Sequence, residues 1–178
     1  LLAQVDSSIG GKTGINNRYG KNLIGSFMQP DLVISDINLL SSLPKRELIC
    51  GYGEILKHSI IDNKKTFNYL TKNFYKIIKL KSPFIEKAIL DSCKIKKKIV
   101  EKDEKEKDLR KILNLGHTFA HAFEAANNYS KNLNHGEAVI LGLICMSKFA
   151  YQNNYLRKSD YEKIINHYKK INLPASLK

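Results

Sequence analysis

The stretch RKILNLGHTFAHAFEA, residues 110–125, decides how the chain folds. Its spacing predicts a helix over residues 109–127, because at about 100° per residue its polar side chains fall within about 40° of one direction. Leucine, phenylalanine and alanine cover the rest of the circumference, which is typical of a buried helix. The polar stripe consists of Arg110, Asn114, His117, His121 and Glu124.

Burying this stripe costs free energy unless its groups are paired or hold a ligand. The stripe therefore predicts a polar cavity, and a solvent-facing stripe on an amphipathic helix is the alternative. His117 and His121 have the i, i+4 spacing of a metal-binding pair, which by itself is a weak signal.

Helical spacing also extends through the rest of the chain after residue 44. Further helices are expected over residues 45–60, 64–79, 83–102, 135–152 and 159–171. Pro83 at a first helical position and the capping-box pair Asn134 and Glu137 mark two of the starts. Before residue 44, apolar runs at 2–5 and 31–35 suit two short strands or loop edges around a glycine-rich loop. The predicted fold class is mainly α, with domains at 1–43 and 44–178.

Length and composition limit the class of protein. The chain has 178 residues, of which 43% are hydrophobic and 26% charged, enough for a folded core. The longest apolar run, residues 138–146, is about half of the roughly 20 residues that a bilayer requires, so no membrane span is expected. Three widely spaced cysteines and no signal peptide predict a reducing, cytoplasmic compartment.

The net charge of +13 favours an anionic partner. Nucleic acid is not the preferred partner, because most of the basic residues are lysines and the chain has no tryptophan. A lysine-rich, solvated surface explains the charge better.

Three other positions are candidates for chemistry. Lys96 lies centrally on the apolar face of the helix at 83–102, so it either extends outward or sits in a cavity facing an anionic substrate. His135, in the first turn of a helix, is kept neutral by the helix dipole and is able to bind a metal. Glu54, Lys57 and His58 in GEILKH read locally as an exposed charge cluster.

Taken together, several blocks of the sequence resemble the 3-dehydroquinate synthase family of the sugar phosphate cyclases. The blocks are DSSIGGKTGIN (6–16), GKNLIGSF (20–27), LPKREL (43–48) followed by GEILKH (53–58), DEKEKDLRKILNLGHTFAHAFE (103–124) and HGEAV (135–139). The resemblance implies a two-domain α/β plus α enzyme, of which this chain holds most of the C-terminal helical domain and a short α/β remnant before it. It also implies a cleft between the domains as the active site.

The resemblance also assigns roles to individual residues. It places a divalent metal, zinc or cobalt, on Glu54, His117 and His135, and makes His121 a polar group of the pocket instead of a ligand. The remaining positions that it implies are Lys57, Lys96, Arg110, Asn114 and His121 for catalysis, Asp6, Lys12 and Asn22 for substrate, and Lys12 and Lys21 for the cofactor.

The activity implied by the resemblance is conversion of 3-deoxy-D-arabino-heptulosonate 7-phosphate to 3-dehydroquinate and phosphate, with NAD and the metal as cofactors. The partners implied are an anionic sugar phosphate and a second copy of the enzyme in a homodimer, without nucleic acid or membrane. Because the family's dinucleotide fingerprint lies upstream of Leu1, the chain alone is expected to be inactive. The alternatives are another sugar phosphate cyclase, or a non-catalytic basic helical module that binds anions or nucleic acid.

Overall fold

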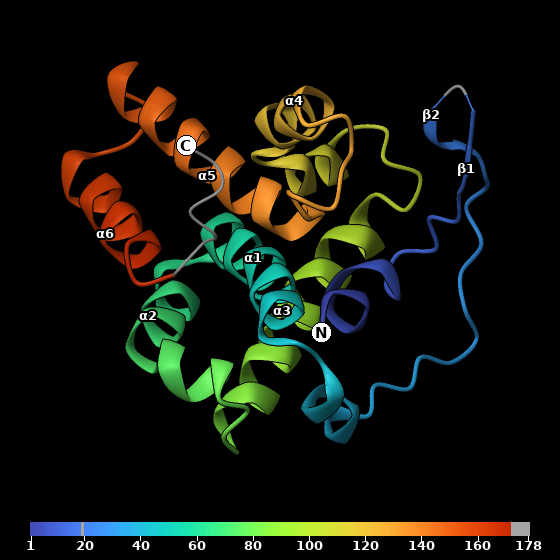
Figure 1. Cartoon of the computed structure of the whole chain (residues 1–178), viewed down its shortest axis with the longest axis horizontal. Coiled ribbons are helices and arrows are strands. Elements are labelled where there is room, and N and C mark those ends of the chain that lie inside the picture. The colour runs from blue at the N-terminus through green and yellow to red at the C-terminus, as the bar shows by residue number, and fades with distance from the viewer. Residues whose placement is uncertain (19, 172–178) are drawn as a thin grey trace.

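The computed structural model describes residues 1–18 and 20–171, apart from the side chains of Asn16, Lys21 and Asn22. Within these ranges the chain is mainly α-helical, as predicted (Figure 1). The elements, in chain order, are η1 (Ala3–Ser7), β1 (Ile15–Asn17), β2 (Gly20–Ile24), η2 (Ile37–Ser42), α1 (Lys45–Asp62), α2 (Lys64–Ile78), α3 (Phe84–Lys102), η3 (Leu109–Asn114), α4 (His117–Ala126), α5 (His135–Gln152) and α6 (Lys158–Tyr168).

Helix α1 is the centre of the fold. It packs against α2, α3 and α5, and α5 in turn packs against α4 and α6 (Figure 1). Residues 48–59 of α1 are all buried, including the polar ones, so this helix has no solvent face over three turns. Side chains that α1 carries near its middle therefore face other helices and not water.

Helices α1 and α5 approach each other closely because glycine lies at their crossing. A Cβ atom at Gly136 would lie 2.2 Å from the carbonyl oxygen of Cys50, and one at Gly53 would lie 2.8 Å from the carbonyl oxygen of Gly136. The close approach brings Glu54 of α1 beside His135, the first residue of α5. The capping box of Asn134 and Glu137 that starts α5 is present, as predicted.

The predicted helix over 109–127 is wrong, because it is broken into η3 and α4. Gly116 joins the two with a φ of +79°, a left-handed conformation that ends a helix. A Cβ atom there would lie 3.0 Å from the backbone nitrogen of Leu143, so packing on α5 also requires glycine. The polar stripe is therefore divided between η3 and α4 and does not lie along one face of a single helix.

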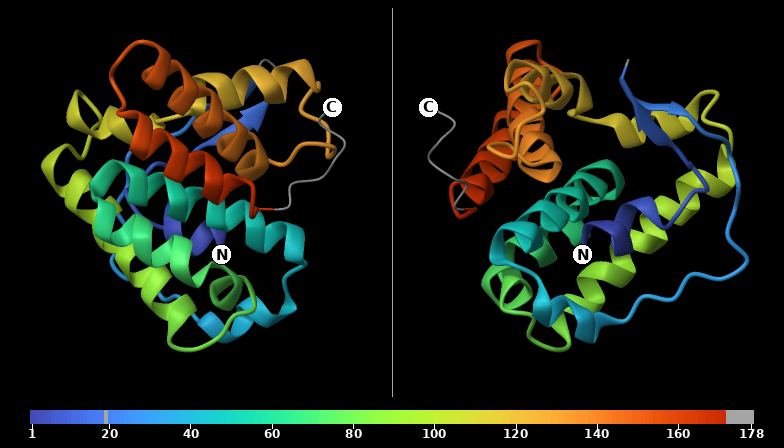
Figure 2. Two further views of the ribbon diagram at one scale, coloured as in Figure 1. Left: turned by 90° about the vertical axis from the view of Figure 1, so that its left-hand side faces the viewer. Right: turned by 45° about the vertical axis from the view of Figure 1, so that its right-hand side comes forward.

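The N-terminal segment differs most from expectation. The strand suggested at residues 2–5 is wrong: the segment belongs to η1, a π-helical turn whose Val5 is fully buried against α1 and α3. The paired strands are instead β1 and β2, an antiparallel hairpin with Ile15 opposite Ile24. Beyond the hairpin, residues 25–36 run outside the helices without helix or strand structure (Figure 2). The division into domains at 43 and 44 stays a prediction.

The other helix starts agree with the sequence within one residue. Helix α3 begins at Phe84, with Pro83 as its cap, and α6 begins at Lys158. None of the helices in the described part of the chain has the length and apolar character needed to cross a membrane.

We expect His167 to make the folded state less stable at mildly acidic pH. Its ring is fully buried among Tyr52, Phe67 and Phe74, and burial lowers its pKa from 6.5 to about 4. Between these values the unfolded chain takes up a proton and the folded chain does not, so stability falls as the pH falls. This group alone accounts for about 1.5 kcal/mol lost between pH 6.5 and pH 5.

Urea unfolding of the parent and of His167→Phe at pH 7 and pH 5 measures this effect. The variant should lose about 2 kcal/mol less than the parent between the two pH values. Equal losses in both proteins would contradict the assignment to His167.

Candidate functional site

The site begins at Glu54, in the buried middle of α1. Burial raises the pKa of its carboxyl group, and the neighbouring Lys57 ammonium opposes that shift. Its Oε2 atom forms an ion pair with Lys57, and its Oε1 atom is buried without a hydrogen-bond partner. A buried, unpartnered carboxylate oxygen is costly and requires an explanation, such as a ligand that it binds.

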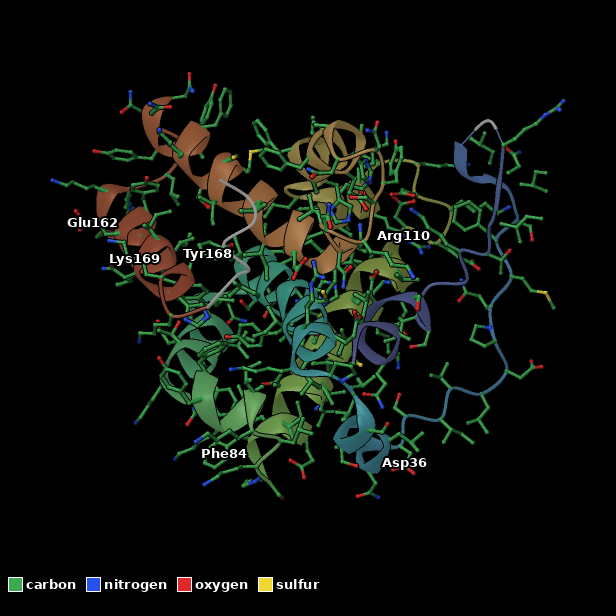
Figure 3. The ribbon with its side chains drawn as sticks, viewed as in Figure 1. Asp36, Phe84, Arg110, Glu162, Tyr168 and Lys169 are labelled. Carbon is green, nitrogen blue, oxygen red and sulfur yellow. The ribbon has the colours of Figure 1, made fainter. Side chains whose placement is uncertain are left out.

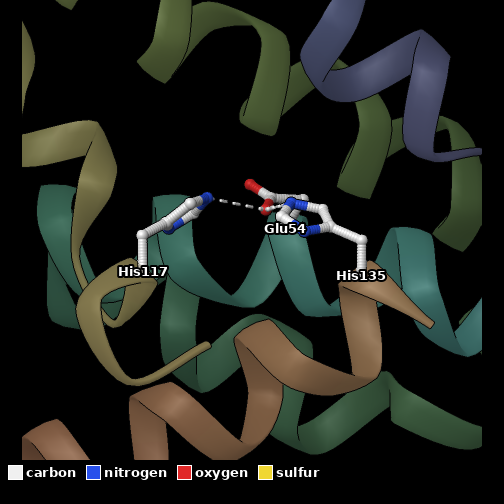
Figure 4. Close-up of side chains that lie close together, drawn as sticks. All are labelled: Glu54, His117 and His135. Carbon is white, nitrogen blue, oxygen red and sulfur yellow. Dashed lines mark ion pairs between the residues drawn. The ribbon is translucent and has the colours of Figure 1, made fainter. Parts of the chain in front are cut away.

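Two histidine rings face that oxygen. The Nε2 atoms of His117 and His135 lie 3.8 and 3.9 Å from Glu54 Oε1 (Figure 4). These distances are too long for hydrogen bonds. Metal–ligand bonds of about 2.0–2.2 Å place neighbouring ligand atoms about 3–4 Å apart, so one ion fits between the three groups. The residues present therefore fit a metal with one carboxylate and two imidazole ligands.

The far nitrogen of each ring is also held. His135 Nδ1 lies 3.3 Å from Oε1 of Glu124, and His117 Nδ1 lies 3.4 Å from the carbonyl oxygen of Leu115. Burial, with help from the Lys57 charge, lowers the pKa of His117 to about 4, so its ring is neutral. A neutral ring whose Nδ1–H donates to a carbonyl presents its Nε2 lone pair to the centre, the arrangement found around protein-bound metals.

His121 is not part of this group, so its spacing with His117 does not mark the ligand pair. Its ring centroid lies 5.5 Å from that of His117, but the side chain is exposed. Asn114 is exposed as well, whereas Arg110 and Glu124 are buried. The prediction of a buried stripe is therefore wrong for two of its five members, and the break at Gly116 divides the stripe between η3 and α4.

The interpretation of Glu54, Lys57 and His58 as an exposed cluster is wrong: all three are at most 2% exposed, because α1 is the central helix.

Next to His117 is a cavity of about 220 Å³. The polar lining of the cavity includes Asp6, Lys12, Lys57, Lys96, Arg110 and Asn114. The side chains of Asn22 and Lys21, two other predicted contacts, lie outside the described residues.

Lys96 faces the interior of the molecule and is 7% exposed. Its Nζ atom donates to both the carboxylate and the backbone carbonyl of Asp6, so η1 and α3 are tied together here. Burial raises the pKa of Asp6, but the charges of Lys96 and Lys57 outweigh that effect and hold the pKa well below its usual range. The cavity thus holds two buried ammonium groups, each paired with a carboxylate.

Arg110 connects η3 to the glycine loop. Its guanidinium donates to the carbonyl of Gly10 at 2.6 Å and to that of Glu104, and Figure 3 places it on the side of the helices that faces the N-terminal segment. A Cβ atom at Gly10 would lie 2.4 Å from Arg110 Nη2, so this glycine makes room for the arginine.

Two acidic residues make contacts at the site that the sequence pattern does not predict. Glu106 pairs with Lys12 and accepts a hydrogen bond of 2.9 Å from Asn114. Although partial burial opposes it, the hydrogen bond from Lys12 lowers the pKa of Glu106. Glu124, which was predicted only as a member of the polar stripe, contacts His135. Neither contact follows a local spacing that a motif would show.

The helical fold is that of the sugar phosphate cyclases. A 2-epi-5-epi-valiolone synthase from Streptomyces hygroscopicus subsp. jinggangensis 5008 superposes with a TM-score of 0.89 at 24% identity, over 97% of this chain and 48% of that one. A 2-deoxy-scyllo-inosose synthase complexed with carbaglucose-6-phosphate, NAD+ and Co2+ gives 0.80 at 31% identity, over 99% and 47%.

Within that class, the family model for the 3-dehydroquinate synthase C-terminal domain matches residues 51–178, and the N-terminal model matches residues 1–50. The chain belongs to the 3-dehydroquinate synthase family. The 3-dehydroquinate synthase of Pelagibacter ubique (strain HTCC1062) is 65% identical over 99% of this chain and 48% of its own length. That of Bartonella quintana (strain Toulouse) is 48% identical over 100% and 47%. The chain spans about half the length of the curated relatives it matches.

Proposed function

We propose that this chain supplies the metal- and substrate-binding part of a 3-dehydroquinate synthase. The reaction is that of a carbon–oxygen lyase in the shikimate pathway of aromatic amino acid biosynthesis: 3-deoxy-D-arabino-heptulosonate 7-phosphate gives 3-dehydroquinate and phosphate. The observation that carries the proposal is the convergence of Glu54, His117 and His135 beside a cavity with buried cationic side chains. The 65% identity to a relative of that name supports it.

The metal proposed is zinc or cobalt, held by Glu54, His117 and His135, and NAD is the second cofactor. When bound, the metal supplies a Lewis acid and NAD accepts and returns a hydride. The unpartnered Glu54 Oε1 and the two facing imidazole nitrogens support the metal. For NAD the support is the family membership and the bound NAD+ of 2-deoxy-scyllo-inosose synthase, with Lys12 and Lys21 as the proposed contacts.

The residues of this chain bind and orient the substrate. Lys57, Lys96 and Arg110 supply charge-assisted hydrogen bonds for the phosphate and carboxylate, which are stronger than neutral ones. Lys57 and Lys96 are paired with Glu54 and Asp6, so the substrate anion competes with a carboxylate for each ammonium group. Because both lysines are almost fully buried, each exchange takes place where water is largely excluded.

The exposed polar residues of the site have subsidiary roles in this proposal. We assign Asn114 and His121, together with Lys12 and Asn22, to contacts with the substrate; of these, Asn114 and Lys12 line the cavity. Glu106 balances the charge of Lys12 and holds the amide of Asn114 at 2.9 Å. A cytoplasmic homodimer, without a nucleic acid or membrane partner, completes the proposal.

Another sugar phosphate cyclase activity is the second candidate, because 2-deoxy-scyllo-inosose synthase shares 31% identity with the chain. A carboxylate-bearing substrate needs cationic groups beyond those that bind the phosphate. Lys57, Lys96 and Arg110 supply three cationic groups at one cavity, which favours the acid substrate. Phosphate release by the complete enzyme from the heptulosonate phosphate, and not from glucose 6-phosphate, would distinguish the two activities.

We expect Lys96→Ala in the complete, zinc-loaded enzyme to weaken substrate binding about 10- to 100-fold. The buried Nζ atom is a charge-assisted donor, and such a bond contributes about 1.5–3 kcal/mol. Lys97→Ala is the matched control, because Lys97 is exposed and lies 3.5 Å from Glu101 on the surface of the same helix. Calorimetric titration with the substrate measures both affinities, and equal losses in the two variants would contradict a role for the inner face of α3.

A further inference from the structure

A line of polar side chains runs through the interior from α3 to the cavity. It consists of Ser92, His58 and Asp6, and the first two are at most 1% exposed. The hydroxyl oxygen of Ser92 lies 2.7 Å from His58 Nδ1. One ligand atom from each of His58, Asp6 and Glu54 lies within 4.8 Å of the others. The three elements α3, α1 and η1 therefore meet at the His58 ring.

The second nitrogen of His58, Nε2, is buried and has no hydrogen-bond partner. Unsatisfied buried nitrogens are rare in native proteins, so this atom requires an explanation. The carboxylates of Asp6 and Glu54 each have an oxygen within 4.8 Å of a nitrogen of this ring. A hydrogen bond to either carboxylate would satisfy Nε2, provided that Nε2 carries a hydrogen.

The surroundings of His58 determine where that hydrogen lies. The ring is neutral, because it is buried beside the ammonium groups of Lys57 and Lys96. A bare Nε2 lone pair facing two carboxylates would be repelled by them, whereas an N–H at that position is attracted. Ser92 can donate its hydroxyl hydrogen to Nδ1, which leaves the ring hydrogen on Nε2. The geometry points to the Nε2–H form.

The hydrogen on His58 Nε2 can serve as a hydrogen-bond donor when the substrate binds. Asp6 takes its hydrogen bonds from Lys96, the same group that the proposed function assigns to the substrate anion. When Lys96 turns to that anion, the Asp6 carboxylate loses those hydrogen bonds and keeps only the charge of Lys57 nearby, while Glu54 stays close by. His58 Nε2–H is a buried donor near that carboxylate with no other partner. We propose that His58 is a positioning residue that holds the Asp6 carboxylate while Lys96 binds substrate, an inference that rests on the proposed function.

A nucleophilic role for the same three residue types does not fit the site. A serine nucleophile must reach its substrate, but Ser92 is 1% exposed and lies at the end of the line away from the cavity. In addition, in the Nε2–H form the Ser92 hydroxyl donates to the histidine and the histidine cannot act as its base.

The position of the hydrogen can be measured without any substrate. Long-range proton–nitrogen NMR spectra of the 178-residue chain distinguish a protonated Nε2 from a protonated Nδ1. We expect Nε2–H for His58 in the parent, and a mixture of the two forms in Ser92→Ala, where Nδ1 has lost its donor. A parent ring protonated at Nδ1 would overturn the inference and leave the proposed function intact.

The positioning role is tested with two amides that imitate different halves of the ring. His58→Gln places an N–H near the Nε2 position, whereas His58→Asn keeps an acceptor for Ser92 and has no donor at Nε2. The probe is inorganic phosphate added to the zinc-loaded chain. We expect His58→Asn to weaken phosphate binding about tenfold or more, which corresponds to loss of one hydrogen bond, and His58→Gln to recover most of the affinity.

Thermal unfolding of each variant separates positioning from packing. If His58 only fills space, both variants lower the melting temperature and neither differs from the other in phosphate affinity, which would overturn the inference. A parent chain that binds neither zinc nor phosphate would instead overturn the proposed function, and with it this inference.

Discussion

Replacing His117 with alanine will lower the zinc affinity of the protein by more than about 100-fold. Removal of a group that only orients a ligand already costs about 10- to 100-fold, and removal of a ligand costs more. His117 presents Nε2 to Glu54 Oε1 at 3.8 Å, and its Nδ1 is held by the carbonyl of Leu115. No rearrangement of the two remaining ligands restores a third donor at that point. Competition with a chromophoric chelator measures the affinity.

His121→Ala is the matched control for this experiment. His121 lies one turn further along α4 and its ring centroid is 5.5 Å from that of His117, but its side chain is exposed. We expect this variant to keep the zinc affinity of the parent within about threefold, since a contact outside the ligand set adds little. Equal losses in both variants would show that His121 belongs to the ligand set and that the group around Glu54 is misassigned.

Sequence spacing located most helices, because their cores follow local rules. The periodic segments that became α1, α2, α3, α5 and α6 were predicted within a few residues at each end. The prediction failed at Gly116, where the spacing predicted one continuous helix. The left-handed turn there is required by the packing of α4 on α5, and the spacing of residues 110–125 carries no information about that contact.

The site depends on contacts between residues far apart in the chain, and local spacing was misleading about them. Spacing alone paired His117 with His121, whereas the structure groups His117 with Glu54 and His135. The i, i+3, i+4 pattern of Glu54, Lys57 and His58 is the same on an exposed helix and on a buried one. Only the resemblance to the family grouped Glu54, His117 and His135, the three residues that the structure brings together. The position of Lys96 on the inner face was an exception, since the surrounding isoleucines defined that face.

A substitution at the crossing of α1 and α5 is expected to have the largest effect on the free energy of unfolding. In a helix, replacing glycine with alanine normally stabilises by about 0.5–1 kcal/mol, because it restricts the unfolded chain. At Gly136 packing outweighs this gain. The new Cβ atom would lie 2.2 Å from the Cys50 carbonyl oxygen and 2.4 Å from its Cα, both backbone atoms of the central helix that cannot turn aside. One of the two helices must therefore move.

We expect Gly136→Ala to lower the free energy of unfolding by about 3 kcal/mol, the upper end of the usual cost of overpacking. Gly51→Ala, also on α1, is the control: its Cβ atom would meet Leu1 Cγ at 2.6 Å and the backbone nitrogen of Leu2 at 2.7 Å, so the N-terminal segment and not the crossing with α5 must move, at a cost of about 1 kcal/mol. Urea unfolding at pH 7 compares the two.

The same substitution should also affect zinc binding. Gly136 directly follows His135, so the shift of α5 that relieves the clash also moves a ligand away from Glu54. Zinc affinity should therefore fall in Gly136→Ala but not in Gly51→Ala. A Gly136→Ala protein with parental stability and zinc affinity would show that the helices are farther apart than the structure places them.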